Sequence, residues 1–129
     1  MLKLGVFGGD YFNATPKEFP HQWFDSVKLS TGGAIAELNC FNILAGQPLS
    51  VWQAKGWIYE EDPKGWFLWY CRYYLGRRIA HEDDRQIRRW LAFSRHLRQL
   101  EQACQPGDIA CQPRRRQALL QWAYDSRKL

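Results

Sequence analysis

The chain has 129 residues, of which 46% are hydrophobic and 24% are charged, and its formal net charge is +5. This composition is typical of a globular protein and argues against a disordered chain, and the length suits a single domain. No apolar run approaches the length that a bilayer requires, and the N-terminal residues Met1–Asp10 are too short and too glycine-rich for a convincing signal peptide. We therefore expect a cytoplasmic protein without a membrane partner.

The first 45 residues predict little regular structure. The segment Leu4–Asp10 suits a short strand or an extended arm that ends in a glycine turn. Aromatic and apolar residues after Pro20 predict a short helix near residues 20–28. The pair Gly32-Gly33 interrupts any longer pattern. We expect an irregular or partly extended N-terminal segment over residues 1–45, packed on a helical domain.

Two helices are predicted next, near residues 49–55 and 63–75. Gly56 suits the end of the first helix. For the second, Asp62 is a good N-cap, Pro63 fits the first helical position, and Gly76 suits the C-terminal end. The boundaries of both helices therefore follow from capping chemistry alone.

The predicted 63–75 helix is apolar almost all round, which is typical of a central helix. Between Gly65 and Arg78 the chain carries six aromatic residues and three arginines. Arg72 is nearly alone among apolar neighbours, so it must reach solvent, an acid or a ligand, because an unpaired buried guanidinium is costly. This segment is expected to organise the core.

Residues 82–103 predict a third, amphipathic helix. Its apolar side carries Trp90, Phe93 and Leu97, and arginines dominate the opposite side. Asp84 and Arg88 have the i,i+4 spacing of a helical ion pair. The apolar faces of this helix and its predecessor are predicted to meet in one core, which contains Trp66, Trp69, Tyr70, Tyr73, Trp90, Phe93 and Leu97.

The last helix is predicted near residues 113–125 and starts at Pro113. Arg114, Arg115 and Arg116 occupy its first turn, where the helix dipole favours negative charge. We therefore expect an anion within hydrogen-bond reach of at least one of them. That anion is either an internal acid such as Asp108 or an external phosphate.

The charge distribution along the chain is strongly asymmetric. All twelve arginines lie at or after Arg72, whereas five of the six lysines precede it. Residues 1–71 carry a net charge of −2 and residues 72–129 a net charge of +7. Arginine favours planar, bidentate partners, which are either internal carboxylates or external phosphates.

A long aromatic and arginine motif runs through the second half of the chain. It reads Trp-Tyr-Cys-Arg-Tyr-Tyr-Leu-Gly-Arg-Arg over residues 69–78 and Asp-Asp-Arg-Gln-Ile-Arg-Arg-Trp over residues 83–90. On these residues, from about Gly46 onward, the chain resembles a family of small uncharacterised proteins and domains. The resemblance implies relatives but no activity, cofactor or catalytic residue.

Four cysteines leave three interpretations open. Reduced structural thiols are the favoured one; a disulfide between Cys104 and Cys111, which flank a turn, is the second. A zinc site is the third, although no paired ligand motif supports it. Cys71 is expected to be a small buried apolar residue, and no metal or cofactor is predicted.

Catalysis has weak support. Cys71 and His81 could form a nucleophile and base, and Asp83 and Asp84 could be paired carboxylates. Adjacent carboxylates at a helix start, however, ordinarily serve capping and dipole roles. The catalytic residues are therefore unknown.

Together these observations predict a mainly α, compact single-domain helical bundle, with residues 1–45 as its irregular segment and residues 46–129 as its helical core. The leading function is binding of a phosphate-bearing ligand, most directly nucleic acid. The alternatives are an enzyme for a small anionic or phosphorylated substrate in an arginine-lined pocket, and a protein-interaction module with an acidic partner. The predicted ligand-binding residues are Arg72, Arg77, Arg78, Arg85, Arg88, Arg89, Arg95, Arg114, Arg115 and Arg116.

Overall fold

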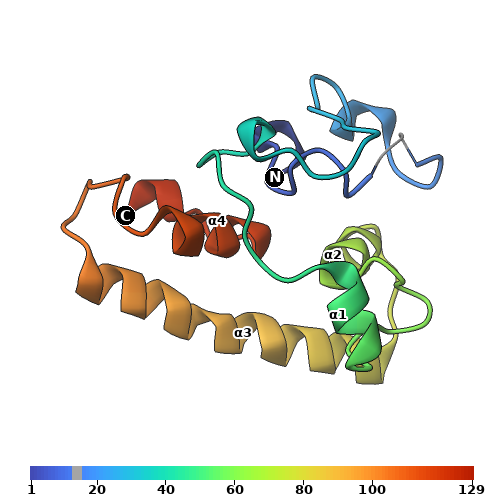
Figure 1. Cartoon of the computed structure of the whole chain (residues 1–129). Helices are drawn as coiled ribbons and strands as arrows, with labels where there is room; N and C mark the ends of the chain where they lie inside the picture. The colour runs from blue at the N-terminus through green and yellow to red at the C-terminus, as the bar shows by residue number, and fades with distance from the viewer. Residues whose placement is uncertain (13–15) are drawn as a thin grey trace. The chain divides into compact units, whose positions relative to one another are not determined.

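The computed structural model describes residues 1–12 and 16–129, and in them the chain is helical and contains no strand (Figure 1). The prediction of a mainly α protein is therefore confirmed. The α-helices are α1 (Leu49–Ala54), α2 (Trp66–Tyr74), α3 (Ala80–Ala103) and α4 (Pro113–Gln121). Short 3-10 helices occupy Leu2–Leu4, His21–Trp23, Ala36–Leu38 and Ser126–Lys128.

Internal contacts divide the chain into two compact units. Unit 1 comprises Met1–Ala45 and Arg95–Leu129, and unit 2 comprises Gly46–Ser94, so the division falls inside α3. Within the described residues, none of the helices combines the length and apolarity that crossing a membrane requires. That residues 1–45 and 46–129 together form one domain stays a prediction.

The helix predicted near residues 20–28 is wrong. Only His21–Trp23 form a single 3-10 turn, and Ser26 has a φ of 61°. A residue other than glycine rarely adopts this left-handed backbone conformation, and a residue in this conformation cannot continue a right-handed helix. The described part of residues 1–45 contains 3-10 turns between irregular segments, as predicted for an irregular N-terminal region.

Unit 1 is held together by polar side chains of α4 as well as by apolar packing. Gln117 is fully buried; its Nε2 donates to Val6 O at 2.7 Å, and its Oε1 accepts from Phe41 N at 3.2 Å. Gly5, at a φ of 62°, lies so close to Leu38 O that a Cβ there would be 1.8 Å away. One amide side chain therefore joins two irregular segments to α4.

In unit 2, α2 starts at Trp66 and not at Pro63, with Gly65 as its N-cap. Asp62 is not an N-cap, because its carboxylate accepts hydrogen bonds from arginines instead. The predicted ends of α1 and α2 are confirmed. Gly56 and Gly76 have φ angles of 65° and 103°, and each donates a backbone hydrogen bond into the last turn of its helix.

The predicted aromatic core is only partly correct. Trp66 and Trp69 are buried, but Tyr70 remains 37% exposed and Trp90 is only half-buried. Phe67, Leu68 and Cys71 are buried as well, and the exposed side of α2 carries Tyr70 and Tyr74. Because almost every position on α2 is apolar, the sequence pattern does not identify which side of the helix turns inward.

A disulfide joins Cys104 to Cys111, with a distance of 5.9 Å between their Cα atoms. The expectation of reduced thiols is therefore wrong for this pair, whereas Cys40 and Cys71 are free. Disulfides persist in oxidising compartments. The pair consequently does not favour the predicted cytoplasmic location, which stays a prediction.

Helix α4 ends at Gln121 rather than near residue 125, because Ala123 has a φ of 60°. Its N–H and that of Tyr124 donate to Leu120 O and Leu119 O, both at 3.0 Å, which closes the helix end. Glycine adopts this conformation without the steric penalty of alanine. We expect Ala123→Gly to raise the free energy of unfolding by roughly 0.5–1 kcal/mol.

Chemical denaturation measures this change in unfolding free energy. Ala118→Gly, inside the same helix, is the matched control and should lower the unfolding free energy by about 1 kcal/mol. A lower stability of the Ala123→Gly variant would contradict the assigned left-handed helix end.

Candidate functional site

Three of the predicted ligand-binding arginines lie around the C-terminal end of α2, and all have internal partners. Arg72 donates to Asp62 Oδ1 at 3.0 Å and to Glu61 O, and Arg77 forms a bidentate pair with Asp62 at 2.9 and 2.5 Å. Asp62 is completely buried. The requirement that Arg72 reach solvent, an acid or a ligand is met by this acid.

Arg78, the third arginine of this group, is held by the end of α2. Its Nη1 donates to Tyr73 O at 2.6 Å and to Arg77 O at 2.7 Å. Its guanidinium carbon lies 3.9 Å from the centroid of the Tyr73 ring, which adds a cation–π contact. Arg78 therefore caps the carbonyl end of α2 rather than standing free.

The arginines of α3 within unit 2 follow the same pattern. Arg85 makes a bidentate pair with the buried Glu82, at 2.6 and 2.7 Å, and Arg89 donates to Gln86 Oε1 at 3.1 Å. Burial and the positive charge of Arg85 lower the pKa of Arg89. Arg88 pairs with Asp84 at 2.5 Å, as the i,i+4 spacing predicts, and both side chains are largely exposed.

Arg116 is a correction to the predicted ligand surface, because its side chain is completely buried. Its guanidinium donates to Cys111 O and Asp108 O, both at 2.9 Å, to Leu129 O at 3.4 Å and to Ser126 O. Main-chain oxygens, and not an acidic side chain, therefore satisfy this charge. A buried side chain with these partners is not available to an external ligand.

Of the two anions predicted as alternatives at the start of α4, the carboxylate of Asp108 does not pair with these arginines. Asp108 uses its carbonyl for Arg116, while its carboxylate accepts from the backbone N–H groups of Ala110 and Cys111 at 3.1 and 3.2 Å. Across residues 1–12 and 16–129, Arg114 and Arg115 make no ion pair with a carboxylate.

Four arginines of unit 1 remain without a hydrogen bond or ion pair in the part of the chain that the structure describes. Arg95 and Arg98 are exposed, three residues apart on one side of α3. Arg114 is exposed and Arg115 half-exposed in the first turn of α4. We call Arg95, Arg98, Arg114 and Arg115 the basic patch.

The pKa of His96 is affected by charges from both helices. Burial lowers the pKa of His96, and the positive charges of Arg95 and then Arg115 lower it further. Arg95 and His96 come from α3 and Arg115 from α4, so one imidazole senses both sides of the basic patch. Neither His96 nor Arg98 was predicted as a site residue, because neither belongs to a recognisable motif.

The start of α4 adds to the positive potential of the basic patch. Its N-cap, Gln112, has a φ of 51° and makes no side-chain capping bond, and the first turn contains no acidic residue. The backbone N–H groups of a helix start and its dipole both favour an anion. No side chain in the first turn of α4 therefore neutralises the positive charge of this helix start.

The residues considered for catalysis serve structural roles. Asp83 accepts from Trp69 Nε1 at 2.8 Å and from Ile79 N at 2.9 Å, so it caps α3 and anchors an indole. Cys71 is buried, whereas reactive thiols lie in partly exposed, electropositive surroundings. His81 is exposed and packs edge-on against Tyr59. Their positions provide no support for a thiol–imidazole mechanism.

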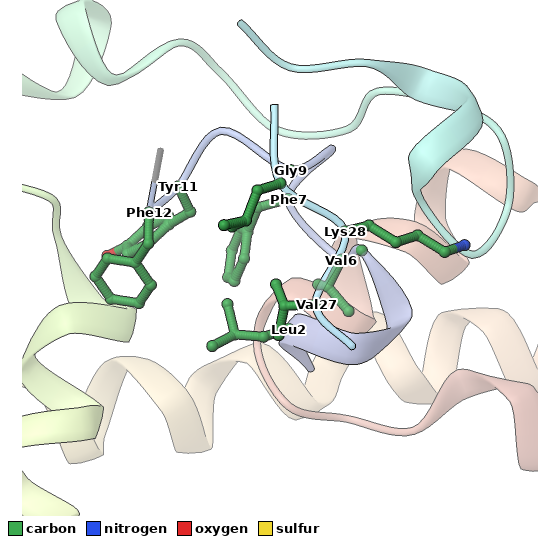
Figure 2. Close-up of a pocket in the computed structure, with 10 residues that line it drawn as sticks. Leu2, Val6, Phe7, Gly9, Tyr11, Phe12, Val27 and Lys28 are labelled. Atoms are coloured by element: carbon green, nitrogen blue, oxygen red, sulfur yellow. The ribbon is translucent and has the colours of Figure 1, made fainter. Parts of the chain in front are cut away.

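A small cavity in unit 1 is lined by apolar side chains of the N-terminal segment, including Leu2, Val6 and Phe12 (Figure 2). Its volume is about 10 Å³, which is close to the space that one water needs. It is too small for an organic ligand. The described side chains also include no group of three or more His, Cys, Asp or Glu residues that could hold a metal ion.

No family model, curated protein or solved structure matches this chain. The resemblance to a family of small proteins, carried by the aromatic and arginine motif, stays a prediction.

Unit 2 contains arginine pairs with a buried carboxylate, Asp62, and with an exposed one, Asp84, and the two should differ in their effect on stability. We expect Asp62→Asn to lower the free energy of unfolding by on the order of 3 kcal/mol, because it leaves Arg72 and Arg77 without their buried counter-charge. Urea denaturation measures this loss.

Asp84→Asn is the matched control, because it removes a largely exposed ion pair. Its effect should remain below about 1 kcal/mol. Equal effects of the two substitutions would show that Asp62 does not have the structural role assigned to it.

Proposed function

We propose that the protein binds a phosphate-bearing polymer, single-stranded nucleic acid, on the basic patch of unit 1. The observation that carries the proposal is that Arg95, Arg98, Arg114 and Arg115 have no internal hydrogen-bond or ion-pair partner in the described residues. Most of the other predicted site arginines are held by acids or carbonyls. Within residues 72–129, the basic patch is thus the group of arginines whose guanidiniums are available to bind a ligand.

Guanidiniums suit phosphate because their planar N–H groups match two phosphate oxygens at once. The start of α4 supplies a helix dipole in the same place as Arg114 and Arg115. Side-chain and backbone donors can therefore contact the same phosphate. This combination supports phosphate over a simple carboxylate partner.

A polymer fits the basic patch better than a small enclosed ligand does. Arg95, Arg98 and Arg114 are exposed, and they belong to two helices rather than to the lining of a cavity. A row of exposed cations binds a repeating phosphate backbone and releases its counterions, which makes affinity depend strongly on salt. An enzyme with a small anionic substrate and a protein-interaction module remain the alternative functions.

The first test compares arginines with and without internal partners. Arg95→Gln and Arg115→Gln should each weaken binding of a short single-stranded RNA several-fold and reduce the slope of log affinity against log salt by about 1. Fluorescence anisotropy over a range of salt concentrations measures both quantities.

Arg88→Gln is the matched control, since Arg88 is exposed on α3 but already paired with Asp84. It should change the RNA affinity by less than about twofold, in keeping with a charge outside the binding surface. An equal loss of affinity for all three variants would indicate diffuse charge attraction and contradict the assigned surface.

The second test uses His96 as a local probe. A bound phosphate would offset the charges of Arg95 and Arg115, so the pKa of His96 should rise when RNA is added. Because protonation of His96 is then favoured in the complex, affinity should increase as the pH falls through this pKa.

NMR titration of the histidine ring protons measures the change, and His21 and His81 serve as internal controls. At a fixed pH, the ring-proton signals of both controls should not move when RNA is added. An unchanged pKa at His96 under saturating RNA would place the ligand elsewhere.

A further inference from the structure

The disulfide between Cys104 and Cys111 closes the loop that connects the two helices of the basic patch. Cys104 directly follows α3, and Cys111 directly precedes Gln112, the N-cap of α4. The bond therefore fixes the end of the helix that carries Arg95 relative to the start of the helix that carries Arg115.

The same loop holds the buried Arg116 of α4. Two of the four main-chain oxygens that accept from its guanidinium, those of Asp108 and Cys111, belong to the loop closed by the disulfide. Residues 105–110 are exposed, so little buried surface restrains them. The disulfide and a few hydrogen bonds thus position the carbonyls on which a buried charge depends.

We propose that the Cys104–Cys111 disulfide is a redox switch that sets the phosphate affinity of the basic patch, an inference that rests on the proposed function. In the oxidised protein the closed loop holds Arg116, and with it the first turn of α4, in a fixed position relative to the end of α3. In the reduced protein the loop opens, and Arg114 and Arg115 lose their fixed position relative to Arg95 and Arg98.

The chemical step is a thiol–disulfide exchange with a thiol reductant. A thiolate of the reductant attacks one sulfur of the pair, the bond between Cys104 and Cys111 breaks, and a mixed disulfide forms. A second reductant thiol then displaces the protein sulfur. The protein gains two electrons and two protons, and the reductant becomes a disulfide. Both cysteines are partly exposed, which allows this approach.

Opening the loop has two physical consequences. The loop regains conformational entropy that the cross-link had removed. The carbonyls of Asp108 and Cys111 are then less firmly held, and a buried guanidinium without its acceptors is unfavourable. Both effects favour movement of the first turn of α4, and a less preorganised site binds more weakly.

The experiment compares the full chain in its oxidised form with the chain reduced by dithiothreitol. Reduction should weaken binding of a short single-stranded RNA about tenfold, through the lost preorganisation of the site. The double variant Cys104→Ser/Cys111→Ser should bind with the weaker affinity whether or not the reductant is present. Cys40→Ser is the matched control, because this free cysteine lies outside the loop, and its variant should keep the full redox response.

A readout without any ligand separates the switch from the proposed function. Reduction should raise the pKa of His96 toward its ordinary value, because Arg115 moves away from it. If the oxidised chain binds no RNA while His96 still responds to reduction, the proposed function fails but the loop movement stands. If RNA binds equally to both redox forms, the switch is overturned and the proposed function stands.

Circular dichroism in the far ultraviolet measures whether the reduced chain remains folded. The reduced chain should retain its helical signal, since a switch requires a folded reduced state. Loss of the helical signal on reduction would overturn the proposal and make the disulfide a purely structural bond.

Discussion

Unit 1 depends on the burial of the Arg116 guanidinium. Four main-chain oxygens, from the loop before α4 and from the segment after it, surround a side chain that has no exposed area. A charge removed from water in this way requires nearly complete hydrogen bonding, because each missing acceptor carries a large desolvation cost. The paths of the loop and of the C-terminal residues are thereby tied to one helical position. The buried side chain of the next residue, Gln117, hydrogen-bonds the main chain of Val6 and Phe41 and so ties these two segments to α4.

Internal pairing explains much of the arginine enrichment in the second half of the chain. Asp62 and Glu82 are buried carboxylates, and each forms a bidentate contact with one arginine that orients the guanidinium. Lysine, with a single ammonium group, could not reproduce this geometry. The function proposed for the remaining basic patch therefore rests on charge that the fold leaves over, and not on the total positive charge of the chain.

The candidate site combines residues that no sequence motif groups together. Arg95 and Arg98 come from α3, while Arg114 and Arg115 start α4, beyond a loop closed by a disulfide. This arrangement couples the covalent chemistry of two cysteines to the position of two cations. The two are coupled because the loop between α3 and α4 is short and its residues 105–110 are exposed, so little buried surface holds it in place.

The sequence by itself determined the helical character of residues 46–129, the ends of α1 and α2 at Gly56 and Gly76, and the Asp84–Arg88 pair. These features depend on local backbone preferences and on spacing along one helix. Only the tertiary structure decided which arginines are paired, because Asp62 and Arg77, or Arg116 and Ser126, meet through folding across many residues. It also decided that the exposed side of α2 is the one with Tyr70 and Tyr74, because apolar residues on nearly every side of this helix gave the sequence pattern no direction.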